Sequence, residues 1–253
     1  MGLLDIWKKI HDHYKGDPGK ITLLTMFMLV LSELPMYFFT VLDILQLPSL
    51  YKYRLHYAHD VAGHLGSRVY PPLHVLKEAL KVTEFNFLFA YLIPGYLAIK
   101  AANKLKIFIY DTEREVTWKR IFKETLAISL IADVMFYVVH RIVHRPGLYQ
   151  FFHKKHHEYK FTIALAHHYM EFHEAFMFAF PQALPPLMLI PFWGRPHIVS
   201  MWMGMFFTQL SGILGHAGYN FFKLPHWLPF FRPAYHDLVS QLPTESCCLM
   251  ATN

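Results

Sequence analysis

Apolar residues along this chain gather in five long stretches that polar residues separate. The stretches are Ile21–Leu47, Phe85–Ala98, Leu126–Val139, Ala175–Trp193 and Ile198–Gly215. A helix that crosses a bilayer needs about 20 mainly apolar residues, so the second and third stretches are long enough only with their flanks. The first stretch also carries Glu33, Pro35 and Asp43, and Pro94 and Gly95 interrupt the second. The pattern predicts an all-α integral membrane protein with about four transmembrane helices, the remaining stretch spanning or lying at the interface.

The last two stretches predict a helical hairpin. Only Gly194, Arg195, Pro196 and His197 join them, which leaves room for a tight turn and nothing longer. Both outer ends of such a hairpin return to the same side of the membrane. We therefore expect the segment before the hairpin and the segment after it to lie together.

Composition agrees with a membrane protein. Charged residues make up 17% of the chain and hydrophobic residues 54%, whereas a soluble domain carries about a quarter charged residues. The formal charge of +6 is typical of the basic flanks of membrane segments, and no basic block interleaved with aromatics indicates nucleic-acid binding. Cys247 and Cys248 are neighbours, so they imply no disulfide framework.

Histidines are concentrated just after the third apolar stretch. His140 and His144 are four residues apart, so on a helix both imidazoles reach one point. His153 stands in the same relation to His156 and His157. These spacings predict two ligand clusters that form a histidine-rich cap at one membrane face. Imidazole suits Zn, Cu, Fe and Ni, so the ligand type does not identify the metal.

Asp133 lies inside the third stretch, seven residues before His140 and on the same helical face. An ionisable residue in a membrane segment is a functional candidate. The sequence allows Asp133 to orient His140 as a carboxylate partner behind the metal ligands, and helix packing is the alternative.

The run from Asp133 to His144, followed by the HxxHH at His153–His157, resembles the fatty acid hydroxylase / sterol desaturase superfamily. This group includes methylsterol oxidases and cholesterol 25-hydroxylase. His173 and His216 are further matches, and the similarity covers roughly residues 120–238. The resemblance implies two iron ions held by histidines, and the matching positions are His140, His144, His153, His156, His157, His173, His216 and His236.

The resemblance also implies a reaction. Two irons with O₂, and electrons from NAD(P)H through a cytochrome b5-type carrier, would hydroxylate or oxidise a lipid C–H bond, most plausibly in a sterol. The implied location is the endoplasmic reticulum membrane, with several passes. Residues 1–119 would be an N-terminal membrane region, 120–238 the hydroxylase-like domain and 239–253 a divergent tail. His156–Tyr159 is similar to methylsterol oxidases and Ala164–Met170 to cholesterol 25-hydroxylase, so the substrate, the regiochemistry and the choice between hydroxylase and desaturase stay open.

The end of the chain departs from the family pattern. The superfamily closes its ligand set with HxxHH, but here His236 is followed by Val239 and Ser240. This divergent or truncated C-terminus, which an alternative exon would explain, removes two implied imidazoles. One alternative is therefore a catalytically impaired isoform that binds lipid or a partner. Another is a zinc-dependent membrane hydrolase or a metal transporter, since imidazoles also suit zinc.

Overall fold

The fold consists of helices, as the sequence predicts. The structure is a computed structural model that describes residues 3–14, 17–53, 71–110, 117–159, 163–219 and 221. Within these ranges there is no strand, and a single isolated bridge joins Ile109 to His197. The all-α prediction is therefore confirmed for the described part of the chain.

Five helical segments are long and apolar enough to cross a membrane, and they arise from the five apolar stretches. They are α2 (Pro18–Ser32) with α3 (Leu34–Leu45), α4 (Leu73–Asn86) with η2 (Phe87–Leu92) and α5 (Ile93–Lys104), α6 (Trp118–Val143), α8 (Phe172–Ala183) with α9 (Pro185–Trp193), and α10 (Ile198–His216). The short elements are α1 (Leu3–Tyr14), η1 (Pro48–Tyr53), α7 (Tyr149–Phe152) and η3 (Ala164–His167). The number of candidate spans is thus five, one more than the four that we expected.

Prolines bend these spans without ending them. Proline removes a backbone donor and crowds the preceding turn, so a helix must adjust around it. Pro35 stands in the first turn of α3, directly after the joint at Glu33. The six residues of η2 form a π-helical turn just before Pro94, which is one of the known ways to bend a helix. The interruption at Pro94 and Gly95 therefore lies within one continuous span.

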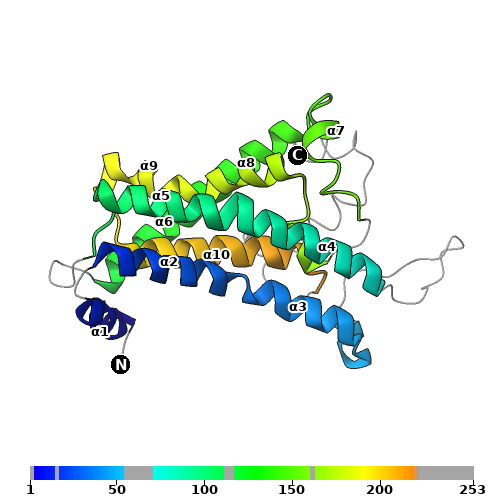
Figure 1. Cartoon of the computed structure of the whole chain (residues 1–253), viewed down its shortest axis with the longest axis horizontal. Helices are drawn as coiled ribbons and strands as arrows, with labels where there is room; N and C mark the ends of the chain where they lie inside the picture. The colour runs from blue at the N-terminus through cyan, green and yellow to red at the C-terminus, as the bar shows by residue number, and fades with distance from the viewer. Residues whose placement is uncertain are drawn as a thin grey trace, which may run out of the picture.

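Helix α10 lies in the middle of the bundle, between α2 and α3 on one side and α4 and α5 on the other in Figure 1. It packs against α6, α2, α3 and η3. Gly204 allows the approach to α6, since a Cβ there would meet Cγ2 of Ile128 at 2.5 Å. Glu124 on α6 is buried and accepts hydrogen bonds from the Ser200 hydroxyl (2.7 Å) and the His197 backbone N–H (2.9 Å). These contacts set α6 beside α10.

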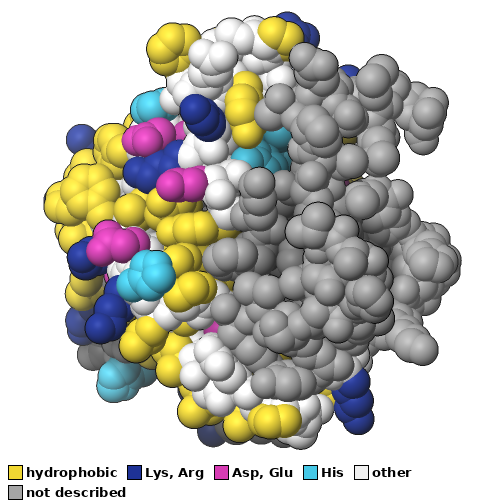
Figure 2. Space-filling view, turned by 90° about the vertical axis from the view of Figure 1, so that its right-hand side faces the viewer, with side chains coloured by type: hydrophobic (Ala, Val, Ile, Leu, Met, Phe, Trp, Pro, Cys, Tyr) yellow, Lys and Arg dark blue, Asp and Glu magenta, His cyan; other side chains and the backbone are white. Residues whose placement is uncertain are grey.

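The outer surface of the bundle suits lipid, and one end of it is polar. Large apolar side chains such as Phe38, Phe122 and Phe192 are more than half exposed. At the end where α7 lies, Lys, Arg, Asp, Glu and His side chains stand among hydrophobic ones (Figure 2). The histidines after α6 and at the end of α10 gather there, which agrees with the predicted cap.

Candidate metal centre

Four imidazoles meet at the end of α6. His140 lies in the last turn of α6 and His144 is its C-cap, and their Nε2 atoms are 3.2 Å apart. His153 and His157 follow α7, and their Nε2 atoms are 3.0 Å apart. The ligand atoms of all four lie within 4.8 Å of one another. The structure therefore brings the two predicted histidine pairs into one four-imidazole cluster.

The second pair reaches this cluster by a different route from the one expected. We predicted a helix that would place His153, His156 and His157 on one face, but α7 ends at Phe152 and residues 153–157 form turns. A backbone hydrogen bond from His157 to His153 (3.4 Å) keeps these two rings together. His156 points instead toward α10, because the chain does not continue as a regular helix.

His156 forms a second grouping with His216, and we refer to these two as the α10 pair. Their Nε2 atoms are 3.1 Å apart, and both side chains are more than nine-tenths buried. His216 is the last residue of α10, at the outer end of the predicted hairpin. The expectation that the segments flanking the hairpin lie together is therefore confirmed. The α10 pair also lies beside the cluster, since the rings of His153 and His156 stack with centroids 5.0 Å apart.

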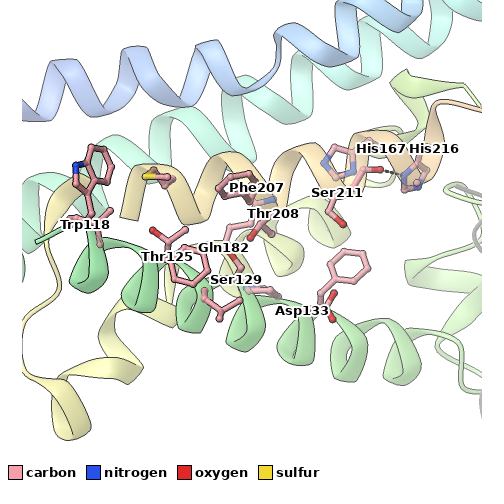
Figure 3. Close-up of a pocket in the computed structure, with 18 residues that line it drawn as sticks. Trp118, Thr125, Ser129, Asp133, His167, Gln182, Phe207, Thr208, Ser211 and His216 are labelled. Carbon is pink, nitrogen blue, oxygen red and sulfur yellow. Dashed lines mark hydrogen bonds between the residues drawn. The ribbon is translucent and has the colours of Figure 1, made fainter. Parts of the chain in front are cut away.

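Three of these rings are held through Nδ1, so that Nε2 is free to act as a ligand. His153 is hydrogen-bonded to the buried carboxylate of Glu174. Nδ1 of His156 lies 3.3 Å from the Tyr169 carbonyl, and Nδ1 of His216 donates to the Gly212 carbonyl at 2.7 Å (Figure 3). Metal-ligating histidines almost always have such a partner on the other nitrogen, which sets the tautomer and the ring orientation.

The donor set fits a metal ion. Two nitrogens that are each about 2.1 Å from one ion lie roughly 3.0–3.4 Å apart in tetrahedral or octahedral geometry, and the pairs here are 3.2, 3.0 and 3.1 Å apart. Burial lowers the pKa of His144 to about 4, and burial together with the neighbouring rings lowers the pKa of His157 to about 3. Both imidazoles are therefore neutral at physiological pH, which is the form that binds metals.

Three of the predicted site residues lie elsewhere. His173 is exposed, with Nε2 2.8 Å from the Phe151 carbonyl, and does not join the cluster. Asp133 makes no hydrogen bond to His140 and lines a cavity instead, so Glu174 is the carboxylate that the structure places behind a histidine. His236 and the neighbouring Val239 and Ser240 lie outside the described residues.

The sequence reasoning missed two buried carboxylates. Glu174 carried no signal beyond its residue type, because it contacts His153 only through the tertiary fold. Glu33 was visible as an ionisable residue in an apolar stretch, yet nothing in the sequence indicated its partners. It is hydrogen-bonded to His168 (3.2 Å) and accepts from the side-chain amide of Gln209, and all three are buried.

A cavity of about 430 Å³ leads to the histidines between α6, α8 and α10. Figure 3 shows it from Trp118, on the first turn of α6, to His167 and His216. Its wall is mainly apolar, with polar side chains at intervals. The polar residues on the helices are Thr125, Ser129, Asp133, Gln182, Thr208 and Ser211.

Known proteins share this region of the chain. The family model for fatty acid hydroxylase matches residues 125–239. Methylsterol monooxygenase 2-2 of Arabidopsis thaliana is 31% identical over 123 residues, which are 48% of this chain and 44% of that protein. Very-long-chain aldehyde decarbonylase GL1-10 of Oryza sativa subsp. japonica is 28% identical, over 45% of this chain and 37% of its own. The chain therefore matches less than half the length of these two relatives.

A longer match extends beyond the family region. Cholesterol 25-hydroxylase-like protein 2 of Danio rerio is 29% identical over 216 residues, which cover 82% of this chain and 70% of that protein. No solved structure matches the chain. The resemblance stated from the histidine motifs is confirmed at the level of the family: the chain carries a fatty acid hydroxylase domain in residues 125–239.

Proposed function

We propose that this chain is a membrane-bound oxygenase that binds two iron ions and hydroxylates or oxidises a C–H bond of a lipid. The observation that carries the proposal is the four-imidazole cluster beside the α10 pair, at the end of a mainly apolar cavity. When bound, iron would activate O₂ with electrons from NAD(P)H delivered by a cytochrome b5-type donor. The relatives with monooxygenase names support an oxidoreductase of this class.

The chain's own residues would hold and shield this chemistry. His140, His144, His153 and His157 would hold one ion, and His156 and His216 would contribute to the other. Glu174 would fix the ring of His153, since its carboxylate is buried beside Nδ1. Burial of His153, His156 and His216 would keep bulk water from the reacting carbon. His173 and His236 remain proposed ligands on the resemblance.

A sterol is the substrate that we propose, in the endoplasmic reticulum membrane. Two of the relatives carry sterol names, a methylsterol monooxygenase and a cholesterol 25-hydroxylase-like protein. The cavity volume lies in the range of about 300–1,000 Å³ that is usual for small-molecule sites. We also propose the division into residues 1–119, 120–238 and 239–253, with the hydroxylase-like domain in the middle.

A catalytically impaired isoform is the second candidate, and Val239 and Ser240 favour it. These residues stand where the superfamily has histidines, and neither valine nor a neutral hydroxyl replaces an imidazole as a ligand. Such a chain would bind lipid or a partner without completing the reaction.

Metal analysis of the purified full chain distinguishes the candidates. Near two irons per chain, with O₂ uptake that requires a reductant and a sterol, supports the oxygenase. Little iron in the natural chain, restored by the double change Val239→His and Ser240→His, supports the impaired isoform. Tight zinc without any O₂ uptake would contradict both, and would leave the zinc hydrolase or transporter.

A further inference from the structure

The cavity between α6, α8 and α10 differs between its two ends. Helices α6 and α10 both run toward the histidines, so residue number orders the wall along its length (Figure 3). Trp118, Ile121 and Phe122 line the distant end. From Trp118 to Asp133 the wall on α6 extends roughly 22 Å, at about 1.5 Å per residue. The cavity is therefore long enough for an elongated lipid.

Polar side chains are concentrated in the half toward the histidines. Ser129 and Asp133 lie there on α6, Thr208 and Ser211 face them from α10 (Figure 3), and His167 is at the end. In the distant half Thr125 is polar, but its hydroxyl is within 3.5 Å of the Ser200 carbonyl. An occupant with one polar end and one apolar end would match this wall in a single orientation.

Two atoms of the wall require a partner. Among the described residues, Nε2 of His167 and Oγ of Ser129 are the cavity-lining polar atoms that are buried and have no hydrogen bond. A buried polar atom left unpaired costs about 1–3 kcal/mol, so such atoms usually have a partner when a ligand is bound. His167 is 7% exposed, and the absence of a side chain at Gly212 lets its ring lie against α10. Both unpaired atoms lie in the polar half.

The charge of the wall selects against an anionic head group. No Lys or Arg lines the cavity within the described part of the chain, and its one carboxylate is Asp133. A carboxylate or phosphate ligand would enter a low-dielectric site without a cation to pair with, at a cost of several kcal/mol per ion. A hydroxyl or a carbonyl has no such cost.

We infer that this cavity binds a neutral amphiphile head first, with its polar group hydrogen-bonded to His167 near the histidines and its apolar body extending toward Trp118. The inference rests on the proposed function and deepens it, because it places the reacting carbon close to the polar group of the lipid. A lipid bound in the opposite direction would present its apolar tail to the histidines, and would leave Nε2 of His167 unpaired.

Two photoactivatable sterols test the orientation in the purified full chain, without turnover. One carries its diazirine on the ring beside the hydroxyl-bearing ring, and the other carries it at the end of the side chain. We expect the ring probe to label the half around Phe136, Ser211 and Gly215, and the side-chain probe to label Trp118 to Leu126. The reversed pattern, or labelling outside the cavity, would overturn the inference.

Competition tests the head-group chemistry. Cholestane, which lacks the hydroxyl, and cholesteryl sulfate, which is anionic, should each compete for the labelled site at least about threefold more weakly than cholesterol, the size of one hydrogen bond of 0.5–1.5 kcal/mol. Equal competition by cholestane would contradict a bound hydroxyl, and tighter competition by the sulfate would contradict a neutral head group.

Variants separate His167 from general effects on folding. His167→Phe keeps a ring but removes both nitrogens, so it should weaken cholesterol binding about three- to tenfold and leave cholestane unchanged. Ser32→Ala removes a buried hydroxyl on α2 away from the cavity, and should change neither. If His167→Phe does not fold, His167→Gln and the labelling of the natural chain decide.

The same measurements distinguish this inference from the proposed function. Head-first labelling in a chain that never consumes O₂ would sink the oxygenase and keep the orientation. Sterol oxidation together with reversed labelling would do the opposite.

Discussion

The four-imidazole cluster and the α10 pair are assembled in different ways. His144 and His153 are nine residues apart in the chain, so the cluster draws its ligands from one helix end and the turns that follow it. His156 and His216 are separated by 60 residues and meet only because the hairpin returns α10 to the same side. Short spacing therefore reveals the cluster in the sequence, whereas the α10 pair depends on the tertiary fold.

The two groupings also differ in completeness. The cluster has four imidazoles within reach of one point among the described residues, and the α10 pair has two. We therefore expect the cluster to bind metal firmly in the natural chain. Binding at the α10 pair should respond to every change that adds or removes a ligand.

His140→Ala should have the largest effect, because it leaves the cluster with three imidazoles and opens it at the end of α6. Loss of a group behind the ligands already costs about 10–100-fold in affinity, so loss of a ligand should lower the affinity of this site by more than about 100-fold. Metal titration of the purified chain measures it. His74→Ala, an exposed histidine on α4, is the control and should bind as the natural chain does.

His156→Ala should remove metal from the α10 pair and spare the cluster. The change leaves His216 alone on α10, whereas all four cluster rings remain. Elemental analysis should therefore show a loss of at most one ion per chain. Complete loss of metal would mean that the two groupings bind as one unit and that the distinction drawn between them is wrong.

Glu174→Gln should weaken the cluster without removing a ligand. The amide keeps the shape of the side chain but loses the negative charge that holds His153, and a change of this kind lowers metal affinity about 10–100-fold. Glu171→Gln is the matched control, since Glu171 faces Lys155 at 3.5 Å on the surface. Equal affinities for the two variants would show that Glu174 has no part in holding the ring.

Much of this architecture follows from local pattern, and the remainder does not. The five apolar stretches predict the five spans, and the spacing of His140 and His144 predicts their contact. The burial of Glu174 beside His153 and of Glu33 beside His168 depends on segments 21 and 135 residues apart, which local periodicity does not reach. The split between His153 and His156 was also hidden, because it arises where the chain leaves helical geometry after Phe152.

Gly212→Ala should have the smallest effect on metal and a clear effect on stability. A Cβ at Gly212 would lie 2.8 Å from Nδ1 of His167, so the buried ring or helix α10 has to shift. Overpacking of this kind costs about 1–3 kcal/mol. The same shift would move the Gly212 carbonyl that holds His216, so metal at the α10 pair should weaken while the cluster is unchanged.

Gly215→Ala separates this steric effect from the helix preference of alanine. Nothing lies within 4 Å of a Cβ at Gly215, and alanine favours a helix over glycine by about 1 kcal/mol. Thermal unfolding of the purified chain should therefore show a lower midpoint for Gly212→Ala and an equal or higher one for Gly215→Ala. Equal midpoints would show that His167 yields without strain, and the α10 pair would then tolerate changes in its support as well as the cluster does.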